Sequence, residues 1–171
     1  MHKTSRKLAF LGLCTAVSMI LAYVEVLLPP IFSAVPGIKI GLANIVILFI
    51  LYRYRVIDAA LVSAVRIFAV TLLFGNPVML AYSAAGAVLS IAVMAILKKI
   101  DILSAVGVSV AGAVFHNVGQ ILMAMALLGT AELGYYLVVL AVTGTISGIF
   151  VGICGGLAIR RLPDFNMKKN S

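Results

Sequence analysis

Charged residues are scarce in this sequence. They make up 11% of its 171 residues, whereas 64% are hydrophobic, and the chain has five acidic residues and no tryptophan. A soluble globular domain is usually about a quarter charged and about half apolar. So few polar groups could not cover the surface of a soluble fold of this length. The composition therefore excludes a soluble or secreted domain and indicates one membrane domain, residues 1–171, in a lipid bilayer.

The sequence also lacks the motifs of several kinds of functional site. Its two cysteines, Cys14 and Cys154, lie in apolar segments without the CxxC spacing of a metal or redox site. No Walker A segment is present to hold nucleotide phosphates. The net charge of +8 comes from short basic clusters between apolar runs and not from one basic face. We therefore expect no metal, no cofactor, no ATP hydrolysis and no nucleic-acid partner for this chain.

What the sequence does contain is a series of apolar runs near the 20 residues that a membrane-spanning helix needs. These runs predict an all-α fold with six transmembrane helices, at residues 8–28, 38–54, 56–74, 78–97, 104–128 and 133–159. The first run is longer than the apolar core of a signal peptide, so we expect a retained span. The second is short and follows Pro29, Pro30, Pro36 and Gly37, which predict an irregular connection.

The basic residues predict the orientation of these helices. When the connections are assigned to alternate sides, eleven of the 13 Lys and Arg residues fall on the side of both termini, Lys39 alone falls on the other side, and Arg66 lies within a span. Short basic loops remain in the cytoplasm. We therefore predict a multi-pass protein of the cytoplasmic membrane with cytoplasmic N- and C-termini.

Small residues spaced by four form a stripe along the last span. They are Gly144, Gly148, Gly152 and Gly156. Small residues let membrane helices approach closely, so this stripe fits packing inside the bundle or, alternatively, a docking face for another protein. Gly12 and Ala16 form a shorter pair of this kind in the first span.

Polar residues at membrane depth are the candidates for a binding site. Arg66 lies near the middle of the third span, where an arginine costs roughly 2.5–3.5 kcal/mol on insertion scales, so it must face protein or water. Glu25, towards the outer end of the first span, fits either a structural salt bridge with Arg66 or a contact with a ligand.

The segment GAVFHNVGQ of the fifth span carries three more polar residues. His116 and Gln120 share a helix face, Asn117 lies beside them, and all three fall at the depth expected of Arg66. Residues that could reach this layer on weaker grounds are Asn44, Asn76, Tyr82, Thr143 and Thr145. Together these positions predict an outward-facing pocket for a small polar or anionic molecule, with Lys39 near its mouth.

Four segments, GIKIGLANIVILFILY, VRIFAVTLLFGNP, AYSAAGAVLSIAVM and GAVFHNVGQ, make the chain resemble a known bacterial family over roughly residues 8–162. That family is called both "heptaprenyl diphosphate synthase component I" and "Gx transporter". Prenyl chain elongation needs Asp-rich motifs that hold Mg²⁺. Here Asp58, Asp101 and Asp164 are scattered, so we expect no self-sufficient prenyl synthase and no enzyme.

The chain also resembles the substrate-binding S component of energy-coupling factor (ECF) transporters. That resemblance implies that Gly12 and Ala16 contact a transmembrane coupling protein, which engages ATPases, although a glycine replaces the first alanine of the usual AxxxA pattern. The leading hypothesis is a binding subunit for uptake of a vitamin, flavin or quinone precursor. Two alternatives remain open: a non-catalytic membrane subunit assisting heptaprenyl diphosphate or quinone synthesis, and a structural subunit of a membrane redox complex.

Overall fold

The computed structural model describes residues 2–27 and 41–162 of the chain. Within these ranges it is helical and has no strand, so the predicted all-α class is confirmed. The helices are α1 (His2–Leu27), α2 (Asn44–Arg53), α3 (Val56–Phe74), α4 (Pro77–Ile100), α5 (Ala105–Leu128) and α6 (Tyr136–Arg161), with a 3₁₀ turn, η1 (Glu132–Tyr135), between the last two. Lys39 lies outside the described residues.

Five of the helices in the described ranges, α1, α3, α4, α5 and α6, are long and apolar enough to cross a membrane. Helix α2 is not, because its 10 residues extend about 15 Å at 1.5 Å per residue, half of a hydrocarbon core about 30 Å thick. Among the described residues the predicted second span, residues 38–54, is helical only over α2, and the count of six membrane-spanning helices stays a prediction. Helix α2 begins only after a turn at Gly41, whose φ of +79° lies in the left-handed region.

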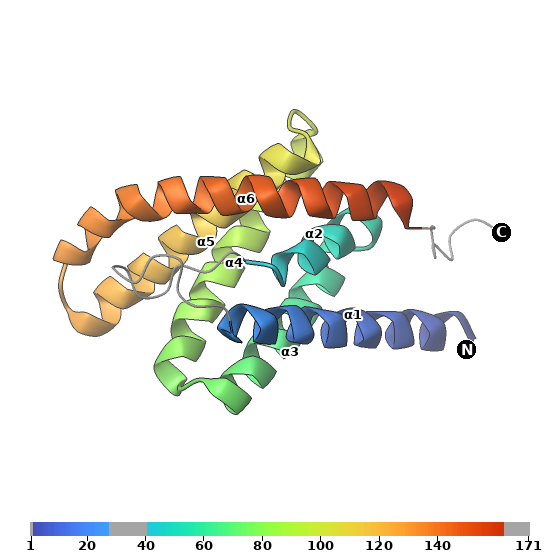
Figure 1. Cartoon of the computed structure of the whole chain (residues 1–171), viewed down its shortest axis with the longest axis horizontal. Helices are drawn as coiled ribbons and strands as arrows, with labels where there is room; N and C mark the ends of the chain where they lie inside the picture. Colours follow the sequence, from blue (N-terminus) through green and yellow to red (C-terminus); the bar gives the residue numbers. More distant parts are fainter. Residues whose placement is uncertain (1, 28–40, 163–171) are drawn as a thin grey trace.

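Turn and capping residues end the longer helices where the sequence indicated breaks. The Asn76 side chain accepts a hydrogen bond from the Met79 N–H at 2.8 Å, and Pro77 occupies the first turn of α4, where its missing N–H costs nothing. Gly129 ends α5 with φ +66°. These short connections join α3 to α4 and α5 to α6 as hairpins (Figure 1).

The glycines of α6 allow it to lie close against α5. A Cβ atom added at Gly148 would stand 2.6 Å from the Val110 Cα atom, and one added at Gly152 would stand 2.7 Å from the Val106 Cα atom. Gly144 likewise meets α5. Only glycine fits such backbone contacts, so these three positions pack within the bundle.

The stripe does not continue to Gly156 as predicted. A Cβ atom there would meet nothing within 4 Å, whereas one at Gly155 would stand 2.7 Å from Leu48 Cδ2. The reason is the helical pitch of 3.6 residues, which carries a four-residue repeat gradually around the helix. The neighbour of α6 also changes, from α5 to α2, and Gly155 is the residue that faces α2.

Although it is short, α2 forms much of the core. Ile47, Leu48, Phe49, Ile50 and Leu51 are all buried, and α2 lies between α1 and α6 in Figure 1. A continuous buried run of this kind is expected of a helix enclosed by others on all sides.

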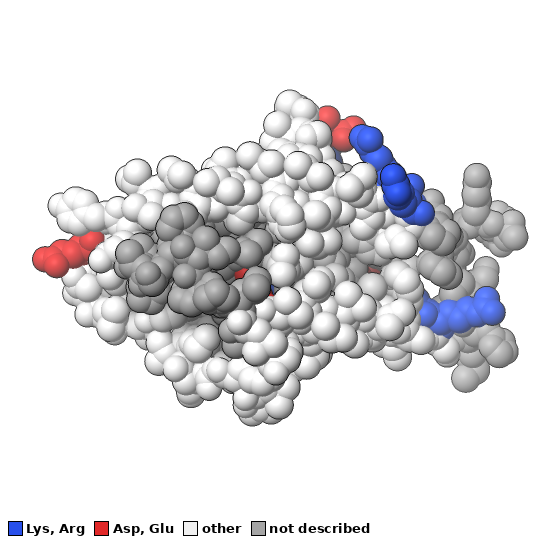
Figure 2. Space-filling model, viewed as in Figure 1, with Lys and Arg blue, Asp and Glu red and all other residues white. Residues whose placement is uncertain are grey.

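Polar contacts join the helices at the end of the molecule where α1 begins and α6 ends. Lys7 of α1 forms a 2.8 Å salt bridge with the buried Asp58 of α3. The Arg53 guanidinium donates to the carbonyl oxygens of Ile159 and Leu162 at the end of α6. Lys and Arg side chains gather at this end in Figure 2, and we call it the basic end.

Candidate functional site

A cavity of about 140 Å³ lies inside the bundle and is lined by residues of all six α-helices. It extends from Phe74 and Gly75, at the turn between α3 and α4, inward to Ser90 and Ser109. A cavity of about 150 Å³ in another protein holds benzene. This space is therefore large enough for a molecule of about one ring.

The cavity brings together all but one of the residues predicted to bind substrate. Those on its wall are Glu25, Asn44, Arg66, His116, Asn117 and Gln120. They come from α1, α2, α3 and α5, so their convergence is a property of the tertiary structure. Tyr82, a weaker candidate, is not on the wall.

Asn76 is the exception among the predicted residues. Its side chain caps the N-terminus of α4 through Met79, and the residue is exposed. An asparagine directly before a helical proline is well placed to cap the helix, which turns its oxygen towards the backbone. Its neighbours Gly75 and Met79 line the cavity instead.

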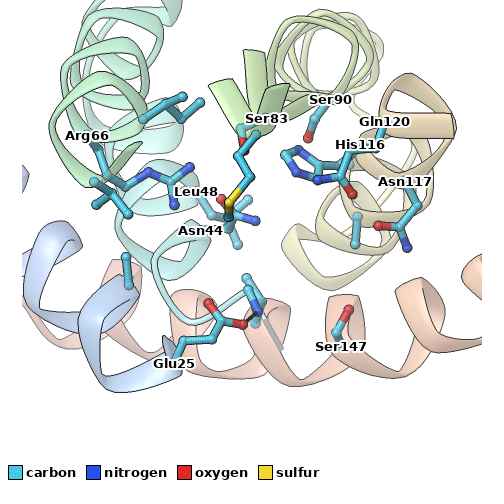
Figure 3. A pocket seen from close by; sticks show the side chains of 18 of the residues that line it. Glu25, Asn44, Leu48, Arg66, Ser83, Ser90, His116, Asn117, Gln120 and Ser147 are labelled. Atoms are coloured by element: carbon cyan, nitrogen blue, oxygen red, sulfur yellow. Dashed lines mark hydrogen bonds between the residues drawn. The ribbon is translucent and has the colours of Figure 1, made fainter. Parts of the chain in front are cut away.

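Arg66 reaches into the cavity from α3, as Figure 3 shows. Its Nε atom is buried and has no hydrogen-bond partner among the described residues. Glu25 of α1 interacts with it electrostatically. A desolvated cation needs a compensating charge and hydrogen-bond acceptors, and Glu25 supplies the charge but leaves the Nε donor without an acceptor.

Glu25 has a backbone partner of its own. Its carboxylate accepts a hydrogen bond from the Gly41 N–H at the turn before α2. A Cβ at Gly41 would stand 3.2 Å from Asn44 Nδ2, and its φ is positive, so glycine suits this position on both grounds. This bond links the C-terminal end of α1 to the beginning of α2.

His116 and Gln120 enter the cavity from the opposite wall (Figure 3). Close contact between α4 and α5 sets their position. A Cβ at Gly86 would stand 2.8 Å from the His116 carbonyl oxygen and 3.0 Å from Gln120 Cγ, and one at Gly119 would stand 2.7 Å from the Ala85 oxygen. These two glycines hold the polar face of α5 against α4.

Asn117 differs from its two neighbours because much of its bonding capacity is used within the bundle. Its Nδ2 atom donates to the Leu140 carbonyl oxygen of α6 at 2.8 Å. Thr143 and Thr145 donate to carbonyl oxygens of their own helix. For Asn117, helix linkage is therefore visible in the structure, whereas substrate contact remains a prediction.

Comparison with family models decides the family. The model described as heptaprenyl diphosphate synthase component I matches residues 14–157. The chain belongs to this family. No curated protein and no solved structure matches the chain. The resemblance inferred from the four sequence segments is thus confirmed for the family, and the cavity described above lies within the matched region.

The family is named after a synthase, so the positions of the carboxylates are of interest. Asp58 is paired with Lys7, and Asp101 ends α4 with φ 58°. Neither lines the cavity, and the described part of the chain holds no group of three or more His, Cys, Asp or Glu side chains that could bind a metal ion. Asp164 lies outside the described residues.

Hydroxyl groups on the cavity wall are the functional candidates that sequence reasoning missed. They belong to Thr71, Ser83, Ser90, Ser109 and Ser147. Single hydroxyls are common in membrane helices and carry little signal by themselves. The seven-residue interval from Ser83 to Ser90, with Gly86 on the same helix face between them, is the pattern that could have revealed them.

The predicted partner-docking residues lie away from the cavity. Gly12 and Ala16 are exposed on α1, and a Cβ at Gly12 would meet nothing within 4 Å in the described structure. Within the described ranges this part of α1 is open for contact with lipid or with another protein. A coupling partner here remains a prediction.

Proposed function

We propose that this protein is a non-catalytic membrane subunit that binds a small polar molecule and, with partner subunits, takes it up into the cell. The observation that carries the proposal is the convergence of polar groups from separate helices on one cavity inside an apolar bundle. A pocket with mainly apolar walls and a few convergent polar groups is the usual form of a small-molecule site.

A purely structural role would have these polar groups satisfy one another. Asn117 fits that role, through its bond to Leu140. The side chains of Asn44 and Gln120 form no hydrogen bond with the residues described, and neither does Arg66 Nε. A bound molecule would provide an acceptor for the buried Arg66 Nε, because buried polar groups in native proteins are nearly always bonded. It would also meet the half-buried side chains of Asn44 and Gln120 on the cavity wall.

Uptake would require energy from elsewhere, because the sequence has no Walker A segment. Under this proposal the exposed surface at Gly12 and Ala16 meets a transmembrane coupling protein with its ATPases, as in the S components that the chain resembles. The basic end would face the cytoplasm, as the distribution of Lys and Arg predicts. Suitable ligands are small vitamins and flavin or quinone precursors.

The experiment is identification of the molecule that the protein retains. The full chain is purified in mild detergent, and compounds released on denaturation are identified by mass spectrometry. We compare it with His116→Ala and Gln120→Ala, and with Arg160→Gln as a control, because Arg160 is exposed at the basic end. We expect one compound retained by the wild type and by the control and lost from both cavity variants. Retention of no compound, or equal retention by all forms, contradicts the proposal.

A second candidate function is a membrane subunit that assists a separate prenyl synthase. The family name favours it. In that case the cavity would hold the apolar chain of a lipid product. Co-purification with a soluble prenyl synthase and restored chain elongation on mixing would support this function over uptake.

A further inference from the structure

The unsatisfied donor of Arg66 constrains the chemistry of the ligand. The Arg66 Nε–H is buried, lies on a cavity-lining side chain and has no acceptor among the described residues. Leaving such a donor unpaired is unfavourable, and more so for a charged group. The missing group is an acceptor, because a guanidinium can only donate.

The beginning of α2 faces the same space. Gly41 and Asn44, at the turn into this half-length helix, both line the cavity. Helix N-termini carry partial positive charge, and discontinuous helices of some transporters direct this end at anionic substrate groups. Arg66 and the α2 N-terminus therefore favour negative charge at one side of the cavity.

The chain itself shows that a carboxylate fits there. Glu25 accepts the Gly41 N–H and interacts electrostatically with Arg66. Glu25 nevertheless does not provide the acceptor that Arg66 Nε lacks among the described residues. A molecule in the cavity would provide that acceptor.

We propose, on the basis of the proposed function, that the ligand is a molecule of about one ring bearing an anionic oxygen group, carboxylate or phosphate, which accepts hydrogen bonds from Arg66 and Asn44. The other side of the ring faces His116 and Gln120 across the cavity. On that side, a polar group of the ligand would bond to the Gln120 amide, which forms no hydrogen bond with the described residues.

Glu25 provides a test of charge that does not depend on knowing the natural ligand. The variant Glu25→Gln keeps an oxygen that can accept the Gly41 N–H and removes one negative charge from the cavity wall. An anionic ligand should then bind more tightly, because a like charge has gone and the charge of Arg66 is no longer offset. A cationic ligand should bind more weakly, and a neutral one about equally.

The probes share one ring and differ in charge: benzoate, phenyl phosphate, benzamide and benzylammonium. Each is added to the full chain in lipid nanodiscs, and unfolding is followed with a thiol-reactive dye, since the chain has no tryptophan but two cysteines.

We expect benzoate or phenyl phosphate to raise Tm at millimolar concentration, and the stronger of the two identifies the anion. Arg66→Gln should weaken that binding at least 10-fold, Arg66→Lys should weaken it less, and Glu25→Gln should tighten it several-fold. Arg160→Gln is the control with the same loss of charge outside the cavity.

Three results would overturn the inference. The first is that benzamide stabilises the protein as much as the anions do. The second is that benzylammonium stabilises it and that Glu25→Gln abolishes this effect. The third is that Arg66→Gln leaves anion binding unchanged. If neither anion binds while the purified protein still retains a natural compound, the anionic group is wrong and the binding function stands. If no compound is retained and no probe binds, the proposed function itself fails. A folded state of each variant is checked by its Tm without probe.

Discussion

The close contact between α5 and α6 makes a specific prediction about two glycines of the same helix. In Gly148→Ala the new Cβ atom would stand 2.6 Å from the Val110 Cα atom, whereas ordinary contact begins at 3.4 Å. The two backbones must therefore separate by about 0.8 Å. In Gly156→Ala the new atom meets nothing within 4 Å among the residues described.

Both variants gain the same preference of alanine over glycine in a helix, about 1 kcal/mol. Only Gly148→Ala also pays for overpacking, which is typically about 1–3 kcal/mol. The difference in unfolding free energy between the two variants is therefore about 1–3 kcal/mol. At about 2–4 °C per kcal/mol for a chain of this size, Tm of Gly148→Ala should lie several degrees below that of Gly156→Ala.

The assay is thermal unfolding of both variants in one detergent, followed by the thiol-reactive dye. Gly155→Ala should fall between them, because the nearest atom is Leu48 Cδ2 at 2.7 Å, the end of a side chain that can rotate. If Gly148→Ala and Gly156→Ala unfold at the same temperature, the helix packing described above is refuted.

Three further predictions concern the caps, the salt bridge and the orientation. Asn76→Ala should lose the helix cap and about 1 kcal/mol of stability but retain the bound compound. Asn76→Asp should restore Tm. If Asn76→Ala loses the compound, Asn76 belongs to the binding site. Lys7→Met should lower Tm more than the double variant Lys7→Met with Asp58→Asn. The single change leaves the Asp58 carboxylate, which is 7% exposed, without its cation. Additive effects in this double-mutant cycle would argue against the ion pair. In a chain without other cysteines, Glu132→Cys should react with an impermeant thiol reagent added to intact cells and Arg160→Cys only after permeabilisation, and the reverse pattern would invert the predicted orientation.

Much of the architecture follows from local properties of the sequence. Five of the helices can be located because a membrane span requires a long apolar run, and such a run is visible without knowledge of its neighbours. The breaks at Asn76 and Gly129 are likewise local, since capping and left-handed backbone depend on one or two residues. The depth of Arg66 and His116 along their helices predicted that both lie in one layer, and both line the cavity.

Other features depend on which helices pack against each other, and helix pairing cannot be read directly from the sequence. The apolar run before Arg53 predicts a membrane span. The helix that it forms is shorter, because it begins after the turn at Gly41, whose N–H group is bonded to Glu25. Gly155 and Gly156 are adjacent in the sequence, and the position of α2 places Gly155 in contact with Leu48.

By itself, then, the sequence determined the class of protein, most of the helices and the polar residues at membrane depth, because hydropathy, turns and helical period act over a few residues. The tertiary structure decided that α2 is half-length and that Asn117 bonds to α6. It also placed Arg66 and His116 on facing walls of one cavity, because the rotation of each helix about its axis is set by contacts with its neighbours.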